Sequence, residues 1–227
     1  MKSPIILALD TKDFETADSW ITATKESVGV FKIGLELFLK IGAEKTKQLK
    51  EKHDISLFLD LKLHDIPNTV AAAATQVALL KPKFLTIHAS GGPAMIQAAV
   101  NAAPGTDITA VTILTSLNQD DIKSIGFIGD ARERAVELAK LAVANGAKAI
   151  VCSPLEIESI RNVIPSNISI ITPGIRPITS ASDDQKRTMD PKSAMKAGAN
   201  FLVIGRPITG EVDKRAAAQE ILRQALG

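Results

Sequence analysis

Short apolar runs alternate with longer amphipathic stretches along the whole chain, and this alternation occurs eight times. The short runs have the composition of buried parallel strands, and the longer ones space their apolar residues as helices do. The expected strands are 5–10, 30–34, 56–62, 84–88, 108–114, 149–152, 168–172 and 201–204. The expected helices are 14–26, 36–52, 67–80, 93–102, 131–145, 154–163, 191–197 and 213–226. Repeated βα units of this kind predict an α/β protein with a parallel sheet.

The eight units account for the full length of the chain. Dividing 227 residues by eight gives about 28 residues per unit, roughly what a strand, a helix and two short loops need. We therefore expect residues 1–227 to form a single domain, a (β/α)8 or TIM barrel. A doubly wound sheet also alternates strands with helices and is the competing architecture.

Polar and glycine residues near the strand ends favour the barrel. A closed barrel brings the carboxyl ends of all its strands to one mouth, whereas an open sheet brings together only those at its switch point. Nearly every expected strand stops at such a residue: Asp10, Lys32, Asp60 with Lys62, His88, Thr115, Ser153, Gly174 with Arg176, and Gly205 with Arg206. The functional site is expected at that mouth.

The composition limits the classes of partner. Lys plus Arg exceed Asp plus Glu by 27 − 25 = 2 without a basic run, which argues against nucleic acid or a membrane surface as the main partner. No run of about 18 apolar residues is present to span a bilayer. Cys152 is the single cysteine, so neither an internal disulfide nor a multi-thiolate metal site can form. These features predict a cytoplasmic protein.

The segment 60–69 carries the strongest functional signal. Strand alternation places Asp60 and Lys62 on one face, roughly 6–7 Å apart along the chain, with leucines on the opposite face. Lys32 and Asp10, at the ends of other strands, add a second cation and a second anion at the same mouth. Charged groups that point into a barrel are costly to desolvate unless they are paired or used in chemistry. The array indicates a catalytic site, with structural ion pairs as the alternative.

On these residues the chain resembles the orotidine 5′-phosphate decarboxylase family. The resemblance rests on 60–69, on PGIRP at 173–177 and VIGRP at 203–207, and on Leu9-Asp10 and FKIG at 31–34. It covers essentially the whole chain, with the motifs in the family's order. It implies decarboxylation of orotidine 5′-phosphate to UMP and CO2, the final step of de novo pyrimidine nucleotide synthesis, with no cofactor and no metal ion.

The resemblance also implies roles for the charged residues. Lys62 would be the proton donor, Asp60 would lie beside the substrate carboxylate, and Lys32 and Asp10 would hold the ribose hydroxyls. This is chemically coherent, because loss of CO2 leaves a ring carbanion with no adjacent electron sink, so a preorganised cation must stabilise and then protonate it. The rest of the motif is expected in the substrate site as well, namely Leu61, Leu63, His64, Pro67 and Asn68.

Asp65 has two interpretations. It can cap the helix that Pro67 opens. The resemblance instead implies that Asp65, Ile66 and Thr69 reach into the site of a neighbouring subunit, which predicts an obligate homodimer with shared active sites.

The phosphate end of the substrate is expected near the last two strands. Gly205 and Arg206 follow the eighth strand, where barrels often bind phosphate through backbone N–H groups and a cation. The polar connection 176–190 is long for a compact domain. Its place at the mouth beside the phosphate site favours a lid over the alternative, a disordered surface loop. The resemblance implies that Gln185 bridges from this lid to the phosphate and that Arg176 and Thr115 contact the substrate.

Two other functions remain as alternatives. A magnesium-dependent sugar-phosphate decarboxylase or aldolase of the same barrel superfamily shares the Asp-x-Lys-x-x-Asp arrangement. A barrel without catalytic activity that senses a phosphorylated ligand is the second alternative. The motif tail 66–69 and the Gln-bearing lid favour the nucleotide enzyme over the first, and the complete charge array favours an enzyme over the second.

Overall fold

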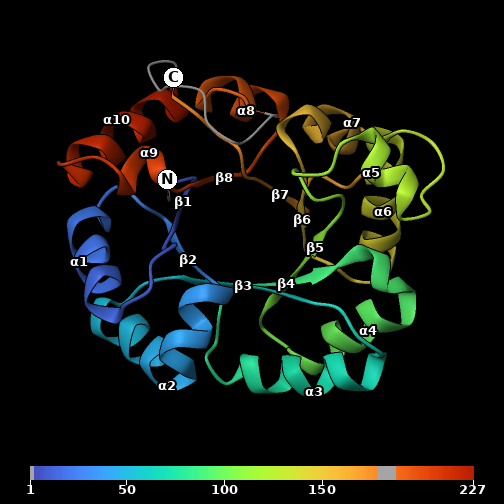
Figure 1. The fold of residues 1–227 in the computed structure, drawn as a ribbon, viewed down its shortest axis with the longest axis horizontal. Helices are drawn as coiled ribbons and strands as arrows, with labels where there is room; N and C mark the ends of the chain where they lie inside the picture. Colours follow the sequence, from blue (N-terminus) through green and yellow to red (C-terminus); the bar gives the residue numbers. More distant parts are fainter. Residues whose placement is uncertain (1–2, 178–187) are drawn as a thin grey trace.

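Eight parallel strands close into a barrel, as the alternating pattern predicts (Figure 1). The structure is a computed structural model and describes residues 3–177 and 188–227. The strands follow one another around the barrel in sequence order, and β1 pairs with β8 to close it. They are β1 (Ile5–Ala8), β2 (Val30–Gly34), β3 (Leu57–Leu63), β4 (Phe84–His88), β5 (Asp107–Val111), β6 (Ala149–Val151), β7 (Ser169–Thr172) and β8 (Phe201–Ile204). The competing doubly wound sheet is therefore wrong.

A ring of helices surrounds the strands (Figure 1). The α-helices are α1 (Phe14–Thr24), α2 (Leu35–His53), α3 (Pro67–Ala78), α4 (Gly92–Ala102), α5 (Gln119–Ser124), α6 (Ala131–Ala144), α7 (Ile157–Arg161), α8 (Pro191–Ala197), α9 (Arg206–Thr209) and α10 (Lys214–Leu226). Two short 3-10 turns, η1 (Ala89–Gly91) and η2 (Pro154–Glu156), precede α4 and α7. The C-terminal α10 packs between α8 and α1, which completes the ring.

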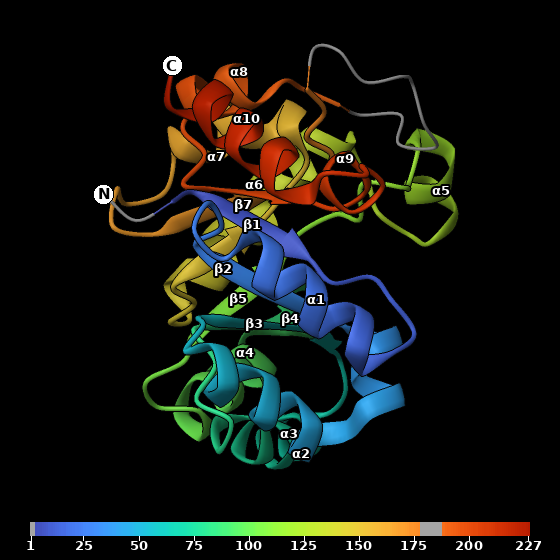
Figure 2. The ribbon, with the colours of Figure 1, turned by 90° about the vertical axis from the view of Figure 1, so that its left-hand side faces the viewer.

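Two helices were not expected from the sequence. The short α5 follows β5 and begins with a capping box, in which Asn118 accepts the Asp121 N–H and Asp121 accepts the Asn118 N–H. The single turn α9 follows β8 directly. Figure 2 shows α5 and α9 at the end of the barrel toward which the β1 arrow points. Both extra helices therefore lie beside the carboxyl ends of the strands.

Apolar side chains of the strands form two layers of core. One set faces outward and packs under the helices, including Leu7, Ile33 and Leu59. The other set fills the inside of the barrel: Ile6, Val30, Phe58, Phe84, Ala149 and Ile171. Because alternate residues of a strand point to opposite faces, the same strands that make the outer core also aim residues into the barrel. In the described part of the chain, no helix has the length and apolar character to cross a membrane.

Candidate active site

A cavity of about 280 Å³ opens at the carboxyl ends of the strands. Its walls combine apolar side chains of the barrel interior, such as Ala8, Val111 and Val203, with polar residues at the strand ends. Eight of the residues expected in the site line it: Asp10, Lys32, Asp60, Lys62, Thr115, Arg176, Gly205 and Arg206. The fold thus brings together residues from both halves of the chain.

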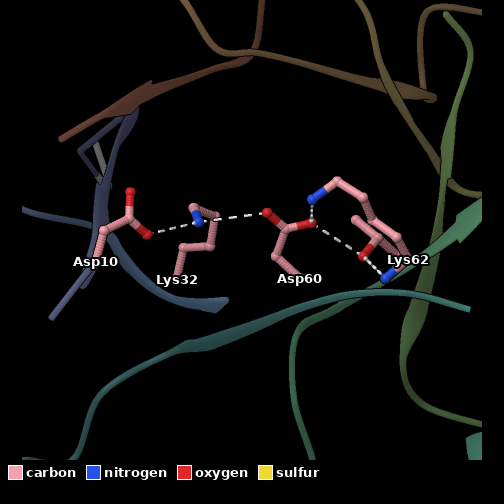
Figure 3. A network of polar contacts seen from close by, with 5 residues as sticks. Asp10, Lys32, Asp60 and Lys62 are labelled. Carbon is pink, nitrogen blue, oxygen red and sulfur yellow. Dashed lines mark hydrogen bonds and ion pairs between the residues drawn. The ribbon is translucent and has the colours of Figure 1, made fainter. Parts of the chain in front are cut away.

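The four charged residues form one continuous chain of contacts (Figure 3). Lys32 Nζ lies 3.3 Å from Asp10 Oδ1 and 3.3 Å from Asp60 Oδ2. On the other side of Asp60, Lys62 Nζ donates to Oδ1 at 2.7 Å. The charges alternate in sign along the order Asp10, Lys32, Asp60, Lys62. Lys32 and Asp60 therefore each lie between two groups of opposite charge. The sequence-based expectation that these side chains meet is confirmed.

Asp60 is the centre of this network. Burial of its carboxyl group opposes ionisation, but the charges of Lys32 and Lys62 and their hydrogen bonds outweigh it and lower the pKa of Asp60. Asp60 therefore carries a full negative charge at neutral pH although only 14% of its side chain is exposed. The Lys62 side chain is more open, with 33% exposed.

An irregularity in β3 sets the position of Lys62. The register with β4 pairs Leu59 with Leu85 and Leu63 with Ile87, so three residues of β3 lie opposite the single Thr86. Within this bulge Lys62 has a φ of +49°, in the left-handed region that residues with a side chain seldom occupy. Simple alternation correctly predicts that Asp60 and Lys62 share a face, but it does not predict the bulge between them.

Thr86 is also part of the network, although it is not among the residues that the sequence predicts for the site. Its hydroxyl accepts the Lys62 N–H at 2.8 Å and donates to Asp60 Oδ1 at 3.1 Å. The available signal was a threonine in the middle of the otherwise apolar segment FLTIH, at the alternate position that faces the barrel interior. A buried hydroxyl at such a position needs a partner, which here is the charged site.

A second group of polar residues lies across the barrel from β3. Gly205 and Arg206 follow β8, and Gly174 and Arg176 follow β7. The Arg176 N–H donates to the Met189 carbonyl at 3.0 Å, which joins the chain before residue 178 to the chain after residue 187. Gln185 lies outside the described residues.

The remaining motif residues do not line the cavity of this chain. Leu61 and Leu63 pack into the core under the helices. The stretch from His64 to Thr69 is exposed to solvent, and it includes Asp65, Ile66, Pro67 and Asn68.

The capping interpretation of Asp65 is wrong. Ile66 occupies the cap position of α3, and no side chain caps this helix. Asp65 instead accepts the N–H of the adjacent Ile66 at 2.6 Å. It is one residue too early in the chain to be the cap, because Pro67 is already the first helical residue.

His64 and His88 stack near the ion network, with ring centroids 5.3 Å apart. Burial, followed by the charges of His64 and Lys62, lowers the pKa of His88. His88 is therefore neutral at pH 7. Within residues 3–177 and 188–227, no three or more His, Cys, Asp or Glu side chains are grouped so that they could hold a metal ion.

Comparison with known proteins gives consistent similarities along the chain. Residues 3–221 match the family described as orotidine 5′-phosphate decarboxylase / HUMPS. The chain is 50% identical over 218 residues to the orotidine 5′-phosphate decarboxylase of Thermobifida fusca (strain YX), which covers 96% of this chain and 94% of that protein. It is 45% identical over 228 residues to the enzyme of the same name from Trichlorobacter lovleyi (strain ATCC BAA-1151 / DSM 17278 / SZ), covering 97% and 94%.

The fold also matches a crystal structure over its full length. The orotidine 5′-phosphate decarboxylase from Lactobacillus acidophilus aligns with a TM-score of 0.88 at 34% identity and covers 100% of both chains. Sequence and structure therefore point to the same group of enzymes.

Proposed function

This chain belongs to the orotidine 5′-phosphate decarboxylase / HUMPS family, and we propose that the Lys62–Asp60 pair performs its reaction, the decarboxylation of orotidine 5′-phosphate to UMP. One observation carries the proposal. The Lys62 ammonium lies 2.7 Å from an anionic carboxylate and lines the cavity at the mouth of the barrel. The magnesium-dependent alternative is not favoured, because the matched relatives are named as orotidine 5′-phosphate decarboxylases.

The chemistry requires a cation that can also give up a proton. The bond between the pyrimidine ring and the carboxyl group breaks, CO2 leaves, and the electron pair stays on the ring carbon. Lys62 Nζ stabilises the developing negative charge and then donates a proton to that carbon, and water restores the ammonium. No external oxidant or electron acceptor is needed.

Asp60 has two roles in this proposal. Its negative charge holds the Lys62 side chain in position before reaction, through the 2.7 Å contact with Nζ. It also places an anion beside the substrate carboxylate, and this repulsion is relieved when neutral CO2 departs. Both roles require an ionised Asp60, which agrees with its lowered pKa.

The rest of the substrate is expected to extend across the mouth of the barrel. Asp10 and Lys32, next to Asp60 in the ion network, are suited to the ribose hydroxyls because they offer an acceptor and a donor. Arg206 and Arg176, near the ends of β8 and β7, supply the cations for the phosphate. Thr115 lines the same cavity, and Gln185 is proposed to contact the phosphate as well.

We further propose that two copies of the chain share their active sites. Asp65, Ile66 and Thr69 are exposed and lie outside the cavity of their own chain, and Ile66 is an apolar residue with 65% of its surface exposed. A neighbouring site would bury Ile66 and give Asp65 a charged environment. The cytoplasm is the proposed location, since the single free thiol of Cys152 suits a reducing compartment.

The test is a direct assay on chelator-treated protein. Addition of orotidine 5′-phosphate is expected to produce UMP, followed as a fall in ultraviolet absorbance. Lys62→Ala is expected to fold and to lose nearly all turnover, while Lys140→Ala, which removes an exposed lysine paired with Glu137, is the matched control. Substantial turnover by Lys62→Ala would refute the assignment, and loss of activity on chelation would favour the magnesium-dependent alternative.

A further inference from the structure

We propose that Thr86 is a positioning residue for the reaction, because its hydroxyl fixes both the backbone of Lys62 and the carboxylate of Asp60. Thr86 lies on β4 and is fully buried. The proposal rests on the proposed roles of Lys62 and Asp60. It assigns Thr86 no contact with the substrate, since Thr86 is absent from the residues that line the cavity.

The pairing of β3 with β4 is interrupted next to Lys62. Between Leu59 and Leu63 the regular register of β3 with β4 is lost. A buried N–H without a partner is costly, and the Lys62 N–H finds its partner in the Thr86 hydroxyl at 2.8 Å. The Thr86 side chain on β4 therefore takes the place of the backbone carbonyl that would accept this hydrogen bond in a regular sheet.

The backbone of Lys62 has an unfavourable conformation. At a φ of +49°, a lysine is less stable than in the ordinary strand conformation, so a specific contact has to hold it there. In an ordinary strand conformation the Lys62 side chain would leave the bulge in a different direction. The hydrogen bond to Thr86 thus secures the direction of the reacting amine.

The chemistry of the partners fixes the direction of both hydrogen bonds of the Thr86 hydroxyl. A backbone N–H can only donate, so Thr86 Oγ1 must accept from Lys62. The ionised Asp60 carboxylate can only accept, so the single hydroxyl proton of Thr86 points at Asp60 Oδ1, 3.1 Å away. Asp60 Oδ1 also accepts from Lys62 Nζ, so this one oxygen couples the hydroxyl to the amine.

The experiment compares Thr86→Val with Thr86→Ser. Valine keeps the shape of threonine and loses both hydrogen bonds, whereas serine keeps the hydroxyl. We expect Thr86→Val to lower kcat by about 10- to 100-fold with KM changed by less than about 3-fold, since small displacements of reacting groups have effects of this size. Thr86→Ser is expected to recover most of kcat.

Thr109→Val is the matched control. Thr109 lies directly opposite Thr86 in the β4–β5 register and is equally buried. Its hydroxyl donates to the Asp107 carbonyl at 3.0 Å and forms no hydrogen bond with Asp10, Lys32, Asp60 or Lys62. Thr109→Val is therefore expected to keep the wild-type kcat. If Thr86→Val does not fold, Thr86→Cys takes its place against Thr86→Ser, because a thiol is a much weaker hydrogen-bonding group of similar size.

Hydrogen exchange of the Lys62 amide gives a readout independent of turnover. Exchange at this amide is expected to be faster in Thr86→Val than in the wild type and in Thr86→Ser. Wild-type kcat and unchanged exchange in Thr86→Val, or equal losses in the valine and serine variants, would overturn the positioning role. If the Thr86 role is overturned but Lys62→Ala is inactive, the proposed function still holds. If Lys62→Ala is active, the proposed function itself is refuted.

Discussion

Lys32 and Asp60 form an enclosed ion pair, with 10% and 14% of their side chains exposed and 3.3 Å between Nζ and Oδ2. Replacing Lys32 with methionine leaves Asp60 paired with Lys62 alone. We expect the pKa of Asp60 to rise and the free energy of unfolding to fall by about 1–3 kcal/mol, because a buried charge loses a partner. The acid limb of the kcat/KM profile should move to higher pH. An unchanged acid limb would show that another group controls it.

The lowered pKa of Asp60 also predicts how stability depends on pH. A carboxyl group whose pKa is lower in the folded chain contributes stability above its unfolded value, and this contribution is lost as pH falls through the folded value. Urea unfolding of the wild type below about pH 5 should therefore show a steeper loss of stability than Asp60→Asn. Asp54→Asn, at an exposed turn, is the control. Equal slopes in wild type and Asp60→Asn would contradict the prediction.

Removal of His64 should change the pKa of His88. Burial is the largest cause of the lowered pKa of His88, and the charge of His64 lowers it further, so His64→Gln is expected to raise that pKa in part. The measurement is an NMR titration of the imidazole signals. His53→Gln is the control, because His53 contacts Asp18 rather than the stacked pair. A lower His88 pKa in His64→Gln would disprove the electrostatic origin.

Subunit mixing tests the shared site. Lys62→Ala and Asp65→Ala are both expected to be inactive as separate preparations. A mixed dimer would contain one site with an intact Lys62 and an intact Asp65. Because random exchange of equal amounts makes about half of the dimers mixed, mixing should restore up to about a quarter of the wild-type activity. Mass spectrometry of the intact dimers must show exchange. Exchange without recovery would count against the shared site.

A methyl group at Gly29 should destabilise the barrel. A Cβ at this position would lie 2.1 Å from the Ser3 carbonyl oxygen, so the backbone of one of the two segments would have to shift. Gly29→Ala is expected to lower the free energy of unfolding by about 1–3 kcal/mol or more, as overpacking does. Urea unfolding measures this change. A neutral effect would mean that the N-terminal segment can move away.

Much of the fold was predictable because each strand and helix has a strong local pattern. The closed barrel followed from eight units and from the polar strand ends, and the structure confirms it. The ends of elements were less accurate: β5 stops at Val111 rather than at 114, and α5 was missed. A six-residue helix fixed by the Asn118 capping box is too short to show a helical period.

The site was predictable to the extent that it depends on which strand end carries which charge. Asp10, Lys32, Asp60 and Lys62 meet as expected. The role of Thr86 was not predictable, because it depends on a bulge that changes the register between two strands. Register irregularities arise from packing between strands and leave no periodic trace in either one.

The pairing of β1 with β8 has a consequence for how the chain is made. The first strand finds its second neighbour only when the last strand has been synthesised. A nascent chain that ends before residue 201 carries two open sheet edges, and exposed edges of apolar strands invite aggregation. Productive folding in the cell therefore depends on the final segment leaving the ribosome, and we expect C-terminal truncations before β8 to be recovered as aggregates rather than as shortened barrels.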